Sequence, residues 1–256
     1  MIELESGDIT AEVSAADGGR VGRLTIGEFD LLVTGDASSS PLAWGCYPMV
    51  PWAGRLRHGR FEHDGRIVEM PIDMAPHAIH GTGYTSAWDV LDQGPDFVEL
   101  DVALAWPLGG RAHQHVQLTP DAIVCVLTVV AGHESLPVTL GWHPWFVKPE
   151  SDHLEFGAYY PCDGEQIPTG ELARPPQRPW DHCFVEPVSP LELVYRHGLR
   201  VRVESDCDHW VVYDQPAHAT CVEPQSGPPN AVNMHRAQVV PPGEMLQRTM
   251  TARWDR

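Results

Sequence analysis

The stretch Phe97-Val-Glu-Leu-Asp-Val-Ala-Leu-Ala-Trp106 decides the fold class. Apolar residues stand at every second position from 98 to 106, with Glu99 and Asp101 between them. Successive side chains of a β-strand point to opposite faces, so this alternation predicts a strand with one buried face. The same pattern recurs where Leu199, Val201 and Val203 alternate with charged residues.

The rest of the chain supports an all-β fold. Asp64-Gly65 separates two short strand-like runs, Arg60–His63 and Arg66–Met70, which predicts a hairpin. No long segment has apolar residues at a period of 3.6, and the 24 prolines would interrupt most helices. We therefore predict a β-sandwich or barrel formed by one domain, residues 1–256, with the proline-rich stretch 169–190 as an excursion over its surface.

The composition excludes several functions. The 256 residues carry 35 Asp and Glu against 17 Lys and Arg, a formal net charge of −18. Such a chain repels a phosphate backbone, so nucleic-acid binding is not expected. Lys148 is the only lysine, and no glycine-rich loop precedes it, which excludes a P-loop.

The six cysteines show no Cys-x-x-Cys spacing. Several stand in apolar runs, where a free thiol behaves as a small core residue, and reduced thiols favour the cytoplasm. The acidic N-terminal residues do not resemble a signal peptide, and the longest apolar stretch, around 122–131, is too short to span a bilayer. We expect a soluble cytoplasmic protein with no membrane partner.

Four segments combine polar residues with aromatic residues and prolines, as binding clefts do. They are Tyr47–Phe61, His77–Trp88, Gly141–Phe146 and Cys221–Asn230. In the last two, His143 and Glu223 each precede a proline, which keeps the preceding residue extended. A titratable side chain on such a stiffened strand, beside tryptophans, is suited to proton transfer.

Each residue alone also has an ordinary structural interpretation. His143 alone is typical of a hydrogen-bonded core histidine, and Glu223 of an edge or turn carboxylate. The pairs His77/His80 and His113/His115 have spacings that metal ligands also use. No carboxylate or cysteine completes either set in the sequence, so we expect no metal and no cofactor.

Taken in order, the segments resemble the aldose 1-epimerase (galactose mutarotase) family, over nearly the whole chain. The matching motifs are Pro-Trp-Ala-Gly-Arg55-Leu-Arg-His-Gly-Arg-Phe, His80-Gly, His143-Pro-Trp-Phe, Asp181-His-Cys-Phe and Val-Glu223-Pro-Gln-Ser-Gly-Pro-Pro-Asn. The resemblance is greatest to the shorter bacterial members. It implies a large two-layer antiparallel β-sandwich with the site in a cleft on one sheet.

The resemblance also implies roles for five residues. His143 would be the general acid and Glu223 the general base. His80 would assist near the ring oxygen or bind a hydroxyl, and Arg55 and Asp181 would bind sugar hydroxyls. Anomers interconvert when the C1 hydroxyl loses a proton while the ring oxygen gains one; the ring opens, rotates about C1–C2 and recloses.

Three positions depart from the family pattern. Gly54 stands where asparagine is common before the arginine, Trp145 where tyrosine is usual, and Val147 where asparagine is common. The acid and the base are kept, but the residues that contact hydroxyls differ. The resemblance therefore supports the reaction more strongly than it supports galactose as the substrate.

Three alternatives remain open at this point. A hexose-6-phosphate 1-epimerase would need a basic rim, to which Arg57 and Arg60 could contribute. A sugar-binding protein would keep the cleft without catalysis, and a metal-dependent enzyme would need a ligand set. We expect a small sugar as the partner and a monomer or homodimer as the assembly.

Overall fold

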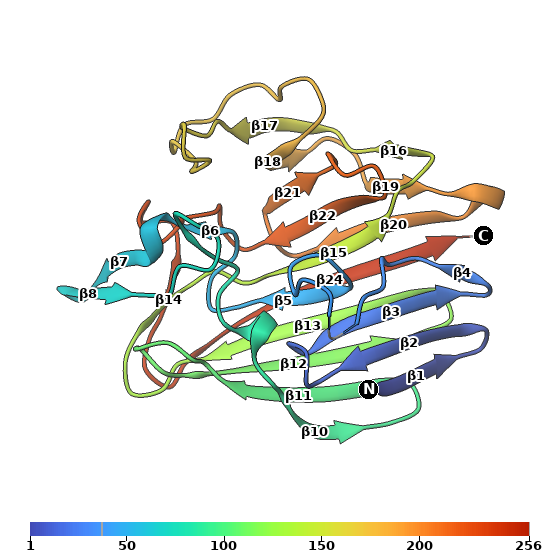
Figure 1. The fold of residues 1–256 in the computed structure, drawn as a ribbon, viewed down its shortest axis with the longest axis horizontal. Helices are drawn as coiled ribbons and strands as arrows, with labels where there is room; N and C mark the ends of the chain where they lie inside the picture. The colour runs from blue at the N-terminus through green and yellow to red at the C-terminus, as the bar shows by residue number, and fades with distance from the viewer. Residues whose placement is uncertain (37, 256) are drawn as a thin grey trace.

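The computed structural model describes residues 1–36 and 38–255 and contains two large antiparallel β-sheets (Figure 1). Within these residues the larger sheet has ten strands and the smaller has eight. One hydrophobic cluster takes buried side chains from both sheets, for example Trp142 and Phe146 from the larger and Leu100 and Leu127 from the smaller. The sheets are therefore the two layers of a sandwich, as predicted.

The larger sheet has the order β1-β2-β3-β5-β15-β22-β21-β18-β17, with β4 paired to β3. Its strands are β1 (Ile2–Ser6), β2 (Ile9–Ser14), β3 (Arg20–Ile26), β4 (Phe29–Asp30), β5 (Cys46–Met49), β15 (Gly141–Val147), β17 (Phe156–Tyr160), β18 (Asp181–Pro187), β21 (His209–Tyr213) and β22 (Ala219–Gln225).

The smaller sheet has the order β10-β11-β12-β13-β24-β20-β19-β16. Its strands are β10 (Asp89–Gln93), β11 (Phe97–Ala103), β12 (Arg111–Leu118), β13 (Ala122–Val130), β16 (Ser151–His153), β19 (Leu191–Val194), β20 (Arg200–Ser205) and β24 (Met245–Asp255).

Short elements complete the structure. In the part of the chain that the structure describes, three two-stranded ribbons pair β6 (Arg55–Leu56) with β9 (Ala78–Ile79), β7 (Arg60–His63) with β8 (Arg66–Glu69), and β14 (Leu136–Val138) with β23 (Gln238–Val240). The helical turns are η1 (Arg57–Gly59), η2 (Gly83–Thr85) and η3 (Arg196–Gly198). No helix among the described residues is long and apolar enough to cross a membrane.

The sequence patterns correspond to these elements. In β11, Val98, Leu100 and Val102 are buried, as the alternation predicted. The β7–β8 hairpin turns at Asp64 and Gly65, which have φ of +48° and +70°, the left-handed pair that a type I′ turn requires.

The stretch 169–190 is only partly a surface excursion. Its second half forms β18, which pairs with β21 and β17 inside the larger sheet. The prolines at 175, 176 and 179 precede this strand, and those at 187 and 190 stand at its end and beyond it. The run between them keeps its backbone N–H groups and can pair on both sides.

Candidate active site

The central strands of the larger sheet align the candidate acid and base. In the β15–β22 pairing, Gly141 lies opposite Gln225 and Trp145 opposite Cys221. This antiparallel register places His143 opposite Glu223, on the same face of the sheet. On that face His143 also lies opposite Tyr47 of β5. The register therefore forms a row of polar and aromatic side chains on the outer face of the sandwich.

His143 and Glu223 are in direct contact. The distance from His143 Nε2 to Glu223 Oε1 is 3.2 Å, and both side chains are buried. Their backbones lie in β15 and β22, in agreement with the extended conformation that the following prolines predicted. Gln225 donates from Nε2 to the second carboxyl oxygen of Glu223, at 3.2 Å. The carboxyl group is therefore held on both sides.

Burial dominates the electrostatics of this pair. Desolvation raises the pKa of Glu223 well above its ordinary value, and the negative charge of Asp181 raises it further. Desolvation lowers the pKa of His143 to about 3. Both shifts favour the uncharged forms, a carboxylic acid and a neutral imidazole. The neutral pair and the ion pair contain the same number of protons and differ only in where one proton lies.

Aromatic rings orient the imidazole of His143. Tyr47 stacks on the ring with a centroid distance of 4.8 Å, and Trp145 stacks on it at 5.4 Å. His80 meets the ring edge-on at 5.1 Å. An imidazole enclosed in this way has little rotational freedom, which reduces the reorganisation needed for proton transfer.

A strained turn brings His80 to the same place. It follows β9 and has a φ of +57°, which is uncommon for a residue with a side chain. His80 N–H donates to the Gly54 carbonyl at 3.0 Å, and Gly54 N–H donates to His80 Nδ1 at 3.2 Å. Because Nδ1 accepts, the neutral ring carries its proton on Nε2. Burial also lowers the pKa of His80 well below its usual value.

The departure from the family pattern at Gly54 has a local explanation. Its φ is +71°, a region that glycine and asparagine both adopt. A Cβ atom on this residue would lie 2.6 Å from the Cβ of Pro229. The close packing of the Pro229 loop therefore requires glycine in this chain.

Arg55 and Asp181 are the other two residues to which the resemblance gives a role. They line the same cleft, half-buried, with 3.6 Å between Arg55 Nη2 and Asp181 Oδ2. Arg55 lies in the β6–β9 ribbon, and Asp181 is the first residue of β18. All five predicted site residues therefore line one cleft.

The cleft has a volume of about 440 Å³. Besides the five predicted residues, its lining includes Tyr47, Met74, Trp145, Tyr213, Gln225 and Pro229. Three buried polar atoms of the lining have no hydrogen-bond partner within the described chain: His143 Nδ1, Trp145 Nε1 and Gln225 Oε1. Buried polar groups are normally paired, so these three atoms are candidates for contact with a polar ligand.

Some of these residues were absent from the prediction. Gln225 stands two positions after Glu223, so strand alternation alone would have placed it on the same face. Tyr47 and Trp145 stand inside quoted segments without an assigned role. Tyr213 has no signal in the sequence, since only the pairing of β21 with β22 brings it to the cleft.

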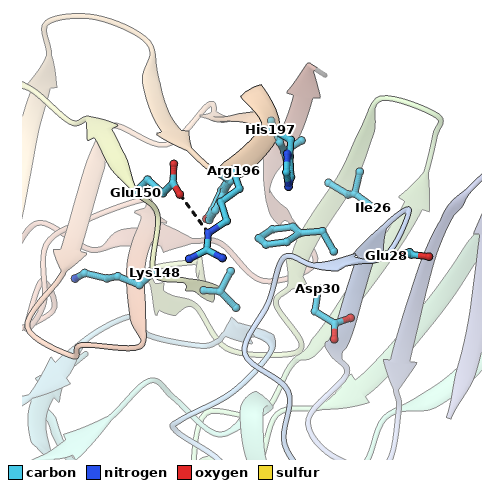
Figure 2. A pocket seen from close by; sticks show the side chains of 11 residues that line it. Ile26, Glu28, Asp30, Lys148, Glu150, Arg196 and His197 are labelled. Carbon is cyan, nitrogen blue, oxygen red and sulfur yellow. Dashed lines mark hydrogen bonds and ion pairs between the residues drawn. The ribbon is translucent and has the colours of Figure 1, made fainter.

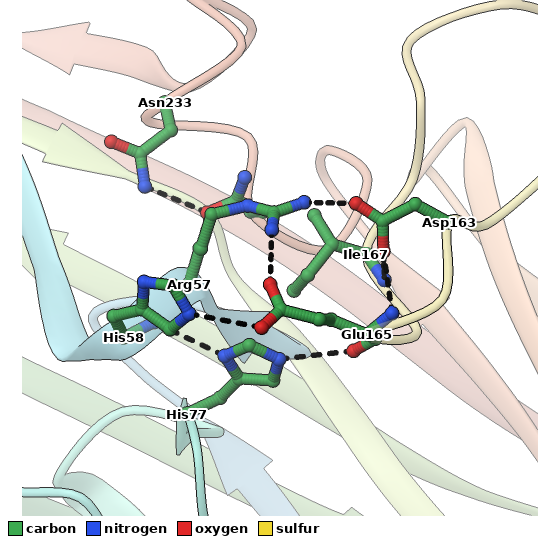
Figure 3. A network of polar contacts seen from close by, with 8 residues as sticks. Arg57, His58, His77, Asp163, Glu165, Ile167 and Asn233 are labelled. Atoms are coloured by element: carbon green, nitrogen blue, oxygen red, sulfur yellow. Dashed lines mark hydrogen bonds and ion pairs between the residues drawn. The ribbon is translucent and has the colours of Figure 1, made fainter.

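His77 and His80, whose spacing metal ligands also use, lie in different surroundings. His77 lies in a network beside the cleft, shown in Figure 3, where its Nε2 is 2.9 Å from the Glu165 carbonyl oxygen. Its Nδ1 accepts from the backbone N–H of His58 at 3.1 Å. Arg57 forms ion pairs with both Asp163 and Glu165 in the same network. His77 is therefore a structural residue, and the charge of Arg57 is already neutralised.

The second pair, His113 and His115, lies on β12. Their Nδ1 atoms face Asp101 and Glu99 of β11, at 2.8 and 3.4 Å. Each histidine has its own carboxylate partner, and the two do not belong to a common ligand cluster among the described residues.

A second hollow lies at the far end of β15 and is the larger of the two, about 770 Å³ (Figure 2). Its cations have partners: Arg196 contacts Glu150, and Lys148 donates to the carbonyl oxygens of Asp214 and Ala219. Val147, one of the departures from the family pattern, lines this hollow. That departure therefore lies outside the residues that line the cleft.

Comparison with known proteins agrees with the fold and with the motifs. A sequence model of the family described as "Aldose 1-epimerase" matches residues 1–253. The uncharacterized protein YphB of Escherichia coli (strain K12) is 29% identical over 162 residues. That match covers 61% of this chain, and it spans only about half, 55%, of the relative.

Solved structures have the same architecture. A putative aldose 1-epimerase from Escherichia coli K12 superimposes with a TM-score of 0.88 at 21% identity, over 99% of this chain and 98% of that one. A galactose 1-epimerase from Lactobacillus acidophilus NCFM superimposes with a TM-score of 0.79 at 16% identity, over 99% and 93%. At these identities the likeness establishes the fold.

Proposed function

Because the chain belongs to the aldose 1-epimerase family, we propose that it interconverts the α and β anomers of a free aldose without a cofactor. The observation that carries the proposal is the contact between His143 and Glu223 inside a cleft with unpartnered polar atoms. An acid and a base side by side at the surface of a sugar-sized cleft are what anomer exchange needs.

The close contact fits the chemistry. The C1 hydroxyl and the ring oxygen of a pyranose are bonded to the same carbon, so the group that takes one proton and the group that gives the other must be neighbours. Opposite positions on β15 and β22 meet this requirement. Glu223 takes the hydroxyl proton, and His143 gives its proton to the ring oxygen. Reclosure on the other face of C1 reverses these roles.

The protonation state follows from the shared proton. The reactive form has a carboxylate at Glu223 and an imidazolium at His143, and it arises from the neutral pair when one proton crosses the 3.2 Å contact. Sugar hydroxyls that bond to the charged groups stabilise this form, because hydrogen bonding to an ionised group offsets its desolvation. Without such hydrogen bonds the neutral pair has the lower free energy, because the buried ion pair carries a larger desolvation cost.

The remaining polar groups suit a neutral sugar. Trp145 Nε1 offers a donor and Gln225 Oε1 an acceptor, neither of which has a partner in the described chain. His80 offers its Nε2 proton. Arg55 and Asp181 lie side by side at 3.6 Å and line the cleft, where each can bind a sugar hydroxyl. Trp145 and Tyr213 line the cleft and offer aromatic edges and faces to the C–H groups of a pyranose.

A sugar phosphate is a poorer substrate for this cleft. Arg57, the candidate phosphate ligand, forms ion pairs with Asp163 and Glu165. Arg60 lies on the exposed face of β7, outside the residues that line the cleft. Arg55 is therefore the one Lys or Arg of the cleft lining within the described chain, and Asp181 lies beside it. We infer that uncharged aldoses are preferred.

Polarimetry tests the proposal. Freshly dissolved α-glucose and α-galactose should reach anomeric equilibrium faster with the purified protein than without it, and α-glucose should be favoured over glucose 6-phosphate. A protein that quenches tryptophan fluorescence on sugar binding but leaves the mutarotation rate unchanged would be a sugar-binding protein instead. Absence of both responses to a panel of aldoses would reject the sugar assignment.

A further inference from the structure

Cys221 lies beside the acid–base pair and has no role in the proposed reaction. It stands two residues before Glu223 on β22, so both side chains project from the same face of the sheet. One ligand atom from each of His143, Cys221 and Glu223 can be chosen so that all three lie within 4.8 Å of one another, and all three side chains are buried.

This is a ligand set that zinc favours. Imidazole nitrogen, thiolate sulfur and carboxylate oxygen bind Zn²⁺ at about 2.0–2.3 Å, which places the ligand atoms about 3.5 Å apart around one ion. The His143–Glu223 contact of 3.2 Å is already close to that spacing. The ligand atoms lie within 4.8 Å of one another, so they need to draw together by no more than about 1.3 Å to surround one ion. Three protein ligands leave a fourth position for water.

The environment favours a reversible ion over a resident one. A histidine that holds a structural or catalytic metal almost always hydrogen-bonds through its second ring nitrogen. Here no other residue of the described chain binds the buried Nδ1 of His143. A metal ion would also occupy both groups that the proposed reaction uses, so bound metal and anomer exchange exclude each other.

We propose that a thiophilic divalent cation of the zinc type binds reversibly to His143, Cys221 and Glu223 and inhibits the enzyme. Binding displaces the thiol proton of Cys221 and the proton shared by the pair, and both protons go to solvent. Mg²⁺ and Ca²⁺ prefer oxygen ligands and should not bind at this set. Inhibition rests on the proposed function, whereas binding of the ion does not.

Cobalt spectroscopy tests the binding itself. Co²⁺ added to chelator-treated wild-type protein should produce the near-ultraviolet absorption of a cobalt–thiolate bond, with one ion per chain, and Zn²⁺ should abolish it. Cys221→Ser should lose this band. Cys46→Ala is the matched control and should keep it, because Cys46 is equally buried but belongs to the core between the sheets. A band that persists in Cys221→Ser, or none in the wild type, would overturn the proposal.

Inhibition is a separate measurement. Zn²⁺ should inhibit mutarotation by the wild type, EDTA should reverse it, and the inhibition constant should rise at least tenfold in Cys221→Ser relative to that variant's own uninhibited rate. Should Cys221→Ser fail to fold by circular dichroism, sugar should still displace Co²⁺ from the wild type, and retention of the band at saturating sugar would contradict a shared site. A cobalt band without any mutarotation would retain this inference and reject the proposed function.

Discussion

Trp142 and Trp145 are both buried on β15, but their side chains project to opposite faces of the sheet. Trp142 faces the core between the sheets, and its indole N–H donates to Gln114 Oε1 at 3.3 Å. Trp145 faces the cleft, and its indole N–H has no partner within the described chain. One face of β15 packs in the core, and the other lines the cleft in which we propose that the sugar binds. The difference separates residues that stabilise the protein from residues that are available for binding.

The largest effect is expected on the cleft face. Glu223→Gln and His143→Gln should each lower kcat by about 10²–10⁴-fold, because each removes one proton-transfer group. Both replacements keep the size of the side chain, so thermal unfolding should change little. Polarimetry measures the rate and circular dichroism the melting. Full activity in both variants would contradict the assignment of acid and base.

The core face should respond in the opposite way. Trp142→Ala removes a fully buried indole and should lower the free energy of unfolding by about 3–5 kcal/mol, as measured by urea titration. Its kcat, measured where the protein remains folded, should fall much less than in the Glu223 variant. A comparable loss of kcat without any loss of stability would mean that the two faces are not functionally distinct.

The pH dependence tests the shared proton. The reactive pair shares one transferable proton. As pH falls through the pKa of His143, about 3, the pair binds a second proton, and as pH rises through the raised pKa of Glu223 it loses the first. We expect kcat/KM to fall about tenfold per pH unit below the pKa of His143, about 3, and again above the raised pKa of Glu223, with a plateau between the two. An inflection near pH 6.5 that disappears in His143→Gln would indicate that the imidazole is not desolvated as described.

The smallest effect is expected from the unpartnered indole. Trp145→Phe keeps an aromatic ring beside His143 but removes the donor, so KM should rise about five- to tenfold, which is the loss of one hydrogen bond to a sugar hydroxyl. Trp142→Phe is the matched control on the core face, and its KM should not change. Initial rates over a range of aldose concentrations separate KM from kcat. An unchanged KM in Trp145→Phe would mean that the sugar does not bind this donor.

Much of the fold was accessible from the sequence because strand alternation and turn chemistry are local. Val98 and Leu100 are buried as their spacing predicts, and Asp64-Gly65 forms the expected turn. The structure of the stretch 169–190 was harder to predict. Its high proline content does not show that the residues between the prolines form a strand, β18, which pairs inside the larger sheet. The five proposed site residues were located by motifs, whereas their contacts depend on partners distant in the chain.

The amino-acid sequence by itself determined the strands, the stiffened backbones at His143 and Glu223, and the motifs of the family, because each depends on neighbouring residues. The tertiary structure decided which of these residues meet. Only the register of β15 on β22 places the imidazole against the carboxyl group, and only the packing of Pro229 explains glycine at position 54. The same register brings Cys221 within reach of both. The register between two strands depends on burial of one whole face of the sheet by residues distant in the chain. No local sequence pattern therefore predicts it.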